Sequence, residues 1–210
     1  MILAPAVEAY LAELLPAPDP VLAEMQEHGA RDHIPIVMPP TGALLELLAA
    51  ATSAARAVEV GTAIGVSTLH LARGGAHVTS FEIDDERRRA AADYLQRAGL
   101  SDRVDLRLQD ATEGLRELEP AAFDLAFIDG PKDGYTGHLE QVITLLRPGG
   151  VLLVDNVLMS GSTASGEPTG PWSRQHVDAM RTFNAQLAAR EDLRATFLPV
   201  GDGVALAVRQ

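Results

Sequence analysis

Cysteine is absent from this chain of 210 residues. The absence excludes disulfide bonds, zinc sites built on thiolates and a catalytic cysteine nucleophile. Aromatic residues are also scarce, at 4% of the sequence. Each aromatic side chain near a binding site therefore has a larger share in any stacking against a ligand.

Basic residues are the minority among the charged ones. The chain has 17 Lys and Arg residues against 29 Asp and Glu residues, which gives a formal net charge of −12. An acidic surface repels nucleic acid and anionic membranes, so we expect neither as a partner. No apolar run is long enough to span a bilayer, and no basic segment leads into an apolar one near Met1, so we expect a cytoplasmic protein.

The sequence does contain a regular alternation of short apolar segments and helical patterns. This alternation predicts an α/β fold, a Rossmann-like, doubly wound and mostly parallel sheet of seven strands. A hairpin signal at Gly201–Gly203 predicts an antiparallel strand near the C-terminal edge. The predicted strands are residues 57–60, 77–83, 104–108, 125–128, 151–154, 195–200 and 204–208.

Residues 1–40 differ from the rest, because prolines interrupt two short helical patterns there. We predict an N-terminal helical appendage over residues 1–40, contributing substrate and dimer contacts, and a main domain over residues 41–210. Thr41 is expected to cap the first helix of that domain. An apolar helix face outside the sheet must be buried somewhere, which favours a homodimer.

A glycine turn follows the first predicted strand, in the segment Glu59-Val60-Gly61-Thr62-Ala63-Ile64-Gly65. Glu82 ends the next strand, where a carboxylate can accept hydrogen bonds from ribose hydroxyls. A nicotinamide site would need Gly-x-Gly-x-x-Gly, but Ala63 and Val66 stand where the second and third glycines belong. The pattern favours a nucleoside cofactor without a pyrophosphate, and the lack of Gly-Lys-Ser/Thr excludes a phosphate-binding P-loop.

Four segments together resemble class I methyltransferases, and more narrowly the cation-dependent O-methyltransferases such as the catechol and caffeoyl-CoA enzymes. The segments are residues 58–67, 81–84, 127–135 and 146–157. The resemblance covers about residues 40–208 and implies S-adenosylmethionine as the methyl donor. It also implies a methyltransferase domain over residues 41–210 and a homodimer. The cofactor-binding residues that we expect are Glu59, Gly61, Ser67, Glu82, Asp110, Ala111 and Asp129.

Asp129, Asp155 and Asn156 each follow a buried predicted strand, so they should project from the same end of the sheet. Two carboxylates and an amide oxygen are hard ligands suited to Mg²⁺ or another divalent cation. The alternative is that these residues only cap loops or helices. In the resembled family, these three positions hold the cation.

Lys132 lies three residues after Asp129. A metal ion and a sulfonium nearby would favour a neutral amine that accepts a proton. The resemblance implies that Lys132 is the general base. Many bacterial relatives read Asp-Ala-Asp-Lys at this place, whereas this chain reads Asp-Gly-Pro-Lys.

The sequence therefore predicts metal-assisted methyl transfer to a hydroxyl of a small, catechol-like aromatic substrate. The alternatives are a tRNA-modifying methyltransferase on the same fold, a nicotinamide-binding oxidoreductase and a catalytically silent interaction protein. Met38, Met159 and Trp172 are candidates for the acceptor pocket, and Tyr135 is expected to be a packed aromatic. The histidines at positions 33, 70, 77, 138 and 176 show no ligand spacing, so we expect structural or exposed roles for them.

Overall fold

In the computed structural model, which describes residues 3–210, seven strands form one sheet in the order β3-β2-β1-β4-β5-β7-β6. β1 to β5 pair in parallel, and β7 pairs antiparallel with both β5 and β6. This arrangement confirms the predicted mostly parallel seven-stranded sheet with an antiparallel C-terminal strand. The strands are β1 (Arg56–Val60), β2 (His77–Glu82), β3 (Val104–Leu108), β4 (Phe123–Ile128), β5 (Leu146–Val154), β6 (Leu193–Leu198) and β7 (Val204–Arg209).

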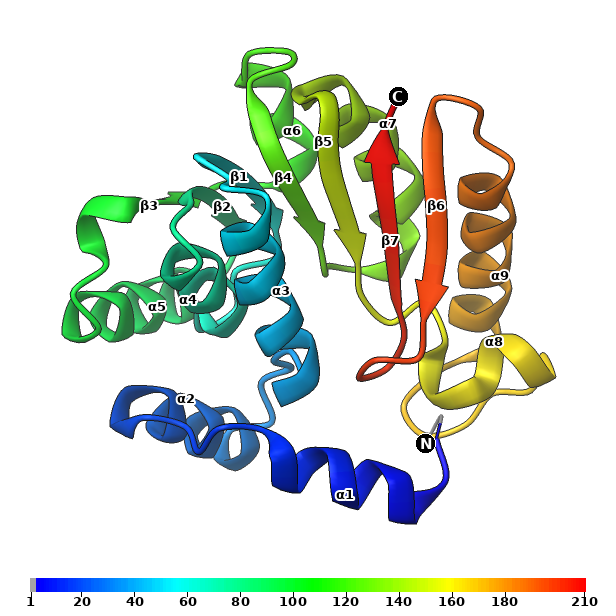
Figure 1. Ribbon diagram of the computed structural model, residues 1–210, viewed down its shortest axis with the longest axis horizontal. Coiled ribbons are helices and arrows are strands. Elements are labelled where there is room, and N and C mark those ends of the chain that lie inside the picture. The colour runs from blue at the N-terminus through cyan, green and yellow to red at the C-terminus, as the bar shows by residue number, and fades with distance from the viewer. Residues whose placement is uncertain (1–2) are drawn as a thin grey trace.

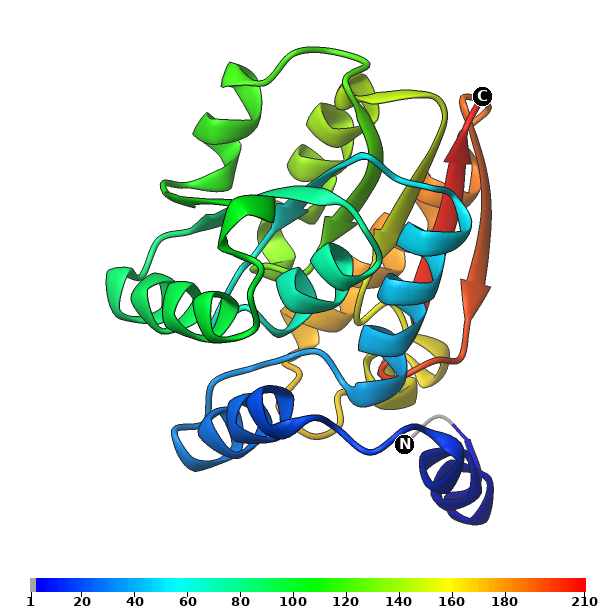
Figure 2. The ribbon, with the colours of Figure 1, turned by 60° about the vertical axis from the view of Figure 1, so that its left-hand side comes forward.

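Helices cover both faces of the sheet (Figures 1 and 2). The side chains of α2, α3, α4 and α5 pack on one face, and those of α7 and α9 pack on the other. The α-helices are α1 (Pro5–Leu14), α2 (Pro20–Arg31), α3 (Pro39–Ala51), α4 (Val66–Arg73), α5 (Asp85–Arg97), α6 (Ala111–Gly114), α7 (Tyr135–Leu145), α8 (Ser162–Ser165) and α9 (Arg174–Ala188). The 3₁₀ turns are η1 (Ser101–Arg103), η2 (Leu115–Glu117), η3 (Lys132–Gly134) and η4 (Met159–Gly161).

The alternation of side chains along β1 explains how one strand serves two cores. Val58 and Val60 belong to the core under α7 and α9, whereas Ala57 belongs to the core under α3 and α4. Because successive side chains point to opposite faces, Glu59 must point toward the α4 side. A strand buried on both faces has few places for polar groups, so those that follow its carboxyl end stand out as site candidates.

Three local predictions were wrong. Thr41 does not cap α3, because the helix starts earlier, with Met38 at the N-cap and Pro39 in the first turn. Proline is favoured at that place, since its missing N–H has no helical partner to lose. β5 starts at Leu146 rather than at residue 151 and crosses a register shift against β4, and the expected long loop of residues 159–174 contains η4 and α8.

The N-terminal segment lies at the carboxyl ends of the parallel strands, toward which β4 and β5 point (Figure 1). In α2, Leu22 and Met25 are buried in the core shared with α4, whereas α1 buries no side chain. Met1 and Ile2, which begin the predicted appendage, lie outside the described residues. None of the helices within residues 3–210 is long and apolar enough to cross a membrane.

Candidate active site

A cavity of about 1130 Å³ opens at the carboxyl ends of the parallel strands. Small-molecule sites commonly span roughly 300–1,000 Å³, so this one has room for a cofactor and an acceptor together. Of the predicted site residues, those that line the cavity are Gly61, Ser67, Glu82, Asp110, Ala111, Asp129, Lys132, Asp155 and Asn156. The sequence therefore placed all but one of the predicted site residues around one space.

Gly61 follows the end of β1 and packs against the backbone at the end of β4. Its φ is +94°, and a Cβ built on it would lie 2.0 Å from the backbone oxygen of Asp129. The amide of Asp129 in turn donates to the carbonyl of Val60 at 2.9 Å. The close backbone approach that glycine allows here is thus to Asp129, and it fixes where the Asp129 side chain enters the cavity.

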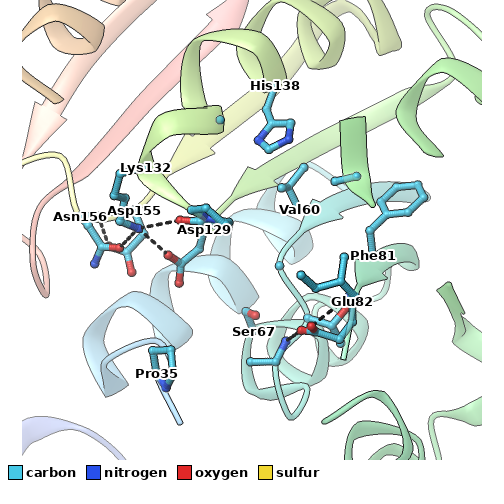
Figure 3. A pocket seen from close by; sticks show the side chains of 18 of the residues that line it. Pro35, Val60, Ser67, Phe81, Glu82, Asp129, Lys132, His138, Asp155 and Asn156 are labelled. Carbon is cyan, nitrogen blue, oxygen red and sulfur yellow. Dashed lines mark hydrogen bonds and ion pairs between the residues drawn. The ribbon is translucent and has the colours of Figure 1, made fainter. Parts of the chain in front are cut away.

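Glu82 is held by backbone N–H groups on both of its oxygens. One oxygen accepts from Ala63 at 2.8 Å, and the other accepts from Ile83 at 2.9 Å and from Asp84 at 3.0 Å. The side chain therefore ties the glycine turn to the end of β2 while it lines the cavity (Figure 3). Each carboxylate oxygen has two lone pairs, so further acceptor capacity is left for a ligand.

Glu59 is fully buried and is not among the residues that line the cavity. Its Oε2 accepts from Thr68 at 2.5 Å and from Ser80 at 2.6 Å. Burial raises the pKa of Glu59 to about 7, against hydrogen bonds from Ser67, Ser80 and Thr68 that lower it. Because Ser67 lines the cavity, Glu59 would influence a bound cofactor through Ser67 rather than by direct contact.

Asp110 is the N-cap of α6, after the end of β3. Its Oδ1 accepts from the amide of Thr112 at 2.8 Å, and hydrogen bonds from Thr112 lower the pKa of Asp110. The Oγ1 of Thr112 lies 3.3 Å from Nε2 of His138. His138 and His176 both line the cavity, so they border the site although neither was predicted there.

The carboxyl ends of β4 and β5 bring two carboxylates together. Asp155 is 2% exposed, and its Oδ1 accepts from the amide of Asn156 at 2.7 Å. Burial raises the pKa of Asp155 well above its usual range, and the negative charge of Asp129 raises it further. Asn156 has a φ of +62°, a left-handed conformation that asparagine adopts more readily than most residues.

Lys132 lies beside Asp129 and Asn156 (Figure 3) and makes four close polar contacts. Its Nζ is 3.2 Å from Oδ1 of Asp129, 2.6 Å from Oδ1 of Asn156, 2.6 Å from Oη of Tyr135 and 3.1 Å from the carbonyl of Gly130. All four contacts are acceptors. An ammonium has three N–H donors to share among these four groups, and a neutral amine has two.

Lys132 is also the single lysine among the 17 Lys and Arg residues of the chain. That count is visible in the sequence and marks the position more sharply than its spacing from Asp129 does. An arginine cannot take up a proton, whereas a lysine amine can lose one and accept it again. The side chain of Lys132 is 9% exposed, so it belongs to the cavity wall and not to the solvated surface.

The donor set of Asp129, Asp155 and Asn156 fits a divalent cation by its chemistry. Across residues 3–210, no three His, Cys, Asp or Glu side chains gather closely enough to hold a metal ion by themselves. The set therefore depends on the amide oxygen of Asn156. The position of the Lys132 ammonium against Asp129 and Asn156 shows that these oxygens already accommodate a positive charge.

The remaining pocket candidates divide into two groups. Met38 and Trp172 line the cavity, and the Trp172 ring lies 5.7 Å from Nζ of Lys132. Met159 is instead fully buried in the core and does not line the cavity. Tyr135 is a packed aromatic as predicted, lying edge-on to Phe183 at 5.5 Å between ring centroids.

Comparison with known proteins identifies the family. The sequence profile of a family described as O-methyltransferase matches residues 15–210. A catechol O-methyltransferase from Niastella koreensis is 34% identical, with 96% of each chain covered. An O-methyltransferase from Streptomyces achromogenes involved in tomaymycin synthesis, solved with S-adenosylmethionine, has a TM-score of 0.84 at 30% identity and covers 98% of this chain and 96% of its own.

A second solved structure gives the same result. An O-methyltransferase from Bacillus cereus, solved with S-adenosylhomocysteine, has a TM-score of 0.84 at 31% identity, with 98% of this chain and 97% of that chain covered. The similarity thus extends over nearly the whole length of both chains, and the profile match includes every cavity residue described above. The chain therefore belongs to the class I S-adenosylmethionine-dependent O-methyltransferase family, as its four sequence motifs predict.

Proposed function

We propose that this enzyme transfers the methyl group of S-adenosylmethionine to a hydroxyl of a small, catechol-like aromatic substrate, with the help of a divalent cation. The observation that carries the proposal is the position of Lys132 between Asp129 and Asn156, beside the cavity. A proton acceptor and a cation-binding set of oxygens thus lie within one hydrogen-bonded cluster. The catechol O-methyltransferase from Niastella koreensis supports the acceptor class by its name.

The cofactor side of the cavity suits a nucleoside with a charged tail. We assign the ribose to Glu82, because its carboxylate is fixed by three backbone N–H groups and faces the cavity. Asp110 and Ala111 border the far end and are assigned to the base. Gly61, Ser67 and Asp129 border the middle, where a negative charge attracts the sulfonium.

The acceptor side is built from Asp129, Asp155 and Asn156, which we assign as the cation ligands. A bound divalent cation would supply Lewis-acid stabilisation of an ionised acceptor oxygen. Trp172 and Met38 border the same cavity and provide the apolar surface that an aromatic ring needs. The chain thereby positions a hydroxyl beside both the cation ligands and Lys132.

Lys132 is assigned as the general base that takes the proton of the acceptor hydroxyl. The side chain is held by Tyr135, whose hydroxyl accepts from Nζ at 2.6 Å and donates to the carbonyl of Asp155 at 3.3 Å. Holding the acceptor oxygen in line with the methyl group is expected to supply a large part of the rate, up to roughly 7–11 kcal/mol.

The test is methyl transfer to a panel of catechols, with Mg²⁺ and with a chelator. We expect product with vicinal diols and its loss when the chelator is added. The controls are monophenols that lack the second oxygen, and they should react poorly. Equal rates with and without the chelator would remove the cation from the proposal, and methylation of tRNA in place of catechols would remove the acceptor class.

We also propose that the enzyme is a homodimer to which the N-terminal segment contributes. α1 buries none of its side chains, and Tyr10 and Leu14 are 61% and 62% exposed. A second copy of the chain would cover this apolar face. Light scattering should give twice the chain mass of 22.3 kDa, and Tyr10→Glu with Leu14→Glu should lower it to the monomer mass. A native chain that already scatters as a monomer would contradict the proposal.

A further inference from the structure

The Lys132 ammonium lies between Oδ1 of Asp129 and Oδ1 of Asn156, where a positive charge is stabilised. Nζ is 3.2 Å from the Asp129 oxygen and 2.6 Å from the Asn156 oxygen. Asp155 directly precedes Asn156, and its Oδ1 accepts from the Asn156 amide at 2.7 Å, so a second carboxylate lies in the same cluster. Lys132 therefore offsets the repulsion between the two carboxylates.

A divalent cation and this ammonium compete for the same oxygens. Mg²⁺ binds oxygen at about 2.0–2.1 Å. A cation bonded to the Asp129 and Asn156 oxygens would therefore lie within a few ångströms of Nζ, with both charges positive and little water between them. The repulsion between the two positive charges therefore favours one occupant of these oxygens at a time.

We propose that Lys132 is the internal counter-ion of the cation-free site and that it leaves Asp129 and Asn156 when a divalent cation is bound. The inference rests on the proposed function, because it assumes that these residues bind the cation. Two aromatic rings already border the ammonium in this position. Nζ lies 4.6 Å from the ring centroid of Tyr135 and 5.7 Å from that of Trp172, so an ammonium that leaves the two oxygens stays within reach of cation–π attraction to these rings.

The composition of the chain supports a movable charge at this position. Every other Lys or Arg position carries arginine, and Lys132 alone carries lysine. The lysine ammonium is a compact charge on a flexible stem, whereas the planar guanidinium forms fixed, forked pairs with carboxylates. An arginine at position 132 would therefore compete with the cation more persistently than lysine does.

The first test is the dissociation constant for Mg²⁺, measured by calorimetry on the native chain, Lys132→Met and Lys132→Arg. We expect Lys132→Met to bind Mg²⁺ more tightly, on the order of 10-fold or more, because a charged competitor has been removed. Lys132→Arg should show no such gain. If Lys132 only supports the local fold, both variants should instead bind Mg²⁺ more weakly, and that result would overturn the inference.

The second test uses the native chain and does not depend on how the variants fold. Because Lys132 is the single lysine, its acetylation by acetic anhydride can be followed by mass spectrometry of one peptide. Its rate should rise when Mg²⁺ is added, and it should stay constant in Asp155→Ala, which lacks one proposed ligand. A rate that is insensitive to saturating Mg²⁺ in the native chain would refute the displacement.

The two proposals fail differently. If methyl transfer requires no divalent cation and calorimetry detects no Mg²⁺ binding, the metal part of the proposed function is wrong and the inference is wrong with it. If methyl transfer requires the cation, yet the native chain and Lys132→Met bind Mg²⁺ equally, only the inference is overturned.

Discussion

The two halves of the cavity satisfy their charges in opposite ways. At the ends of β2 and β3, Glu82 and Asp110 accept hydrogen bonds from nearby backbone N–H groups. At the ends of β4 and β5, Asp129 and Asp155 repel each other, and Lys132 provides the opposing charge. The hydrogen bonds of the first half are thus already in place, whereas the charge balance of the second half would change if it binds a cation as we propose.

The largest expected effect comes from a substitution at the ends of β4 and β5, which we call the cation half. The ends of β2 and β3, which we call the cofactor half, are left unchanged by it. Lys132→Met should lower the rate of methyl transfer by about 10²–10⁴-fold if general-base catalysis is its whole role. S-adenosylhomocysteine binding should stay close to that of the native chain, because Glu82 and Asp110 are unchanged. Steady-state rates with a catechol, together with calorimetry for the cofactor product, measure the two effects separately.

The pH dependence of the same variant separates a base from a merely structural lysine. In the native chain, the rate should rise with pH as the base loses its proton, and in Lys132→Met that rise should flatten. Lys132→Arg is the matched control, since it keeps the charge but cannot accept a proton. Full activity and an unchanged profile in Lys132→Met would refute the base assignment and leave the metal site standing.

The second effect concerns the point at which the two halves meet. Gly61→Ala would place a Cβ 2.0 Å from the backbone oxygen of Asp129, at a φ of +94°. Gly75→Ala is the matched control, because its φ is +107° but no atom lies within 4 Å of the added Cβ. We expect Gly75→Ala to lose about 1–3 kcal/mol of stability from backbone strain alone, and Gly61→Ala to lose more than about 3 kcal/mol.

Denaturant unfolding of both variants gives the comparison directly. The difference between them isolates the clash with Asp129 from the strain that both share. Equal losses would mean that the ends of β1 and β4 separate easily, and the cation half would then not be fixed by the glycine turn.

The mostly parallel seven-stranded sheet followed from the sequence because several of its strands carry simple signals. β1 and β4 contain short apolar runs that are followed by Gly61 and Asp129, and the Gly201–Gly203 turn predicts the β6–β7 pair. The start of β5 was missed because Pro148, Gly149 and Gly150 signal a break. These residues lie in an extended segment where the pairing with β4 shifts register, which no local pattern reveals.

Of the site, the sequence predicted only the residues that end or follow the strands. Asp129, Asp155 and Asn156 could be placed together because parallel strands end at one edge. The contacts of Lys132 with Tyr135 and Asn156 depend on how η3 folds over the end of β5, and spacing does not determine that. Glu59 was expected to touch the cofactor, yet the alternation along β1 turns it toward α4; its influence on the cofactor remains a prediction.

Glu59 offers a third test, because burial disfavours the ionised form of its carboxyl group. Its pKa is about 7 in the folded chain against a usual 4.5. The folded state therefore keeps a proton that the unfolded state loses, so raising the pH from about 4.5 to about 7 favours unfolding. The free energy of unfolding should fall by about 3 kcal/mol more in the native chain than in Glu59→Gln over this range. Parallel stability curves for the two proteins would contradict this.

The smallest effect, and the most direct test of a preformed cofactor half, comes from Glu82. Glu82→Gln keeps the shape of the side chain but removes its charge and turns an NH2 group toward the N–H of Ala63 or toward those of Ile83 and Asp84. Glu82→Ala instead loses all three of these hydrogen bonds. A ribose hydroxyl bonded to a charged acceptor contributes roughly 1.5–3 kcal/mol, so Glu82→Gln should weaken S-adenosylhomocysteine binding by about 10-fold or more. Mg²⁺ binding should remain that of the native chain, because Asp129, Asp155 and Lys132 lie across the cavity. If Glu82→Gln binds the cofactor product normally and only Glu82→Ala fails, Glu82 acts by shaping the turn and the ribose contact is wrong. If either variant also changes the affinity for Mg²⁺, the two halves are coupled through Gly61, and the division between them does not hold.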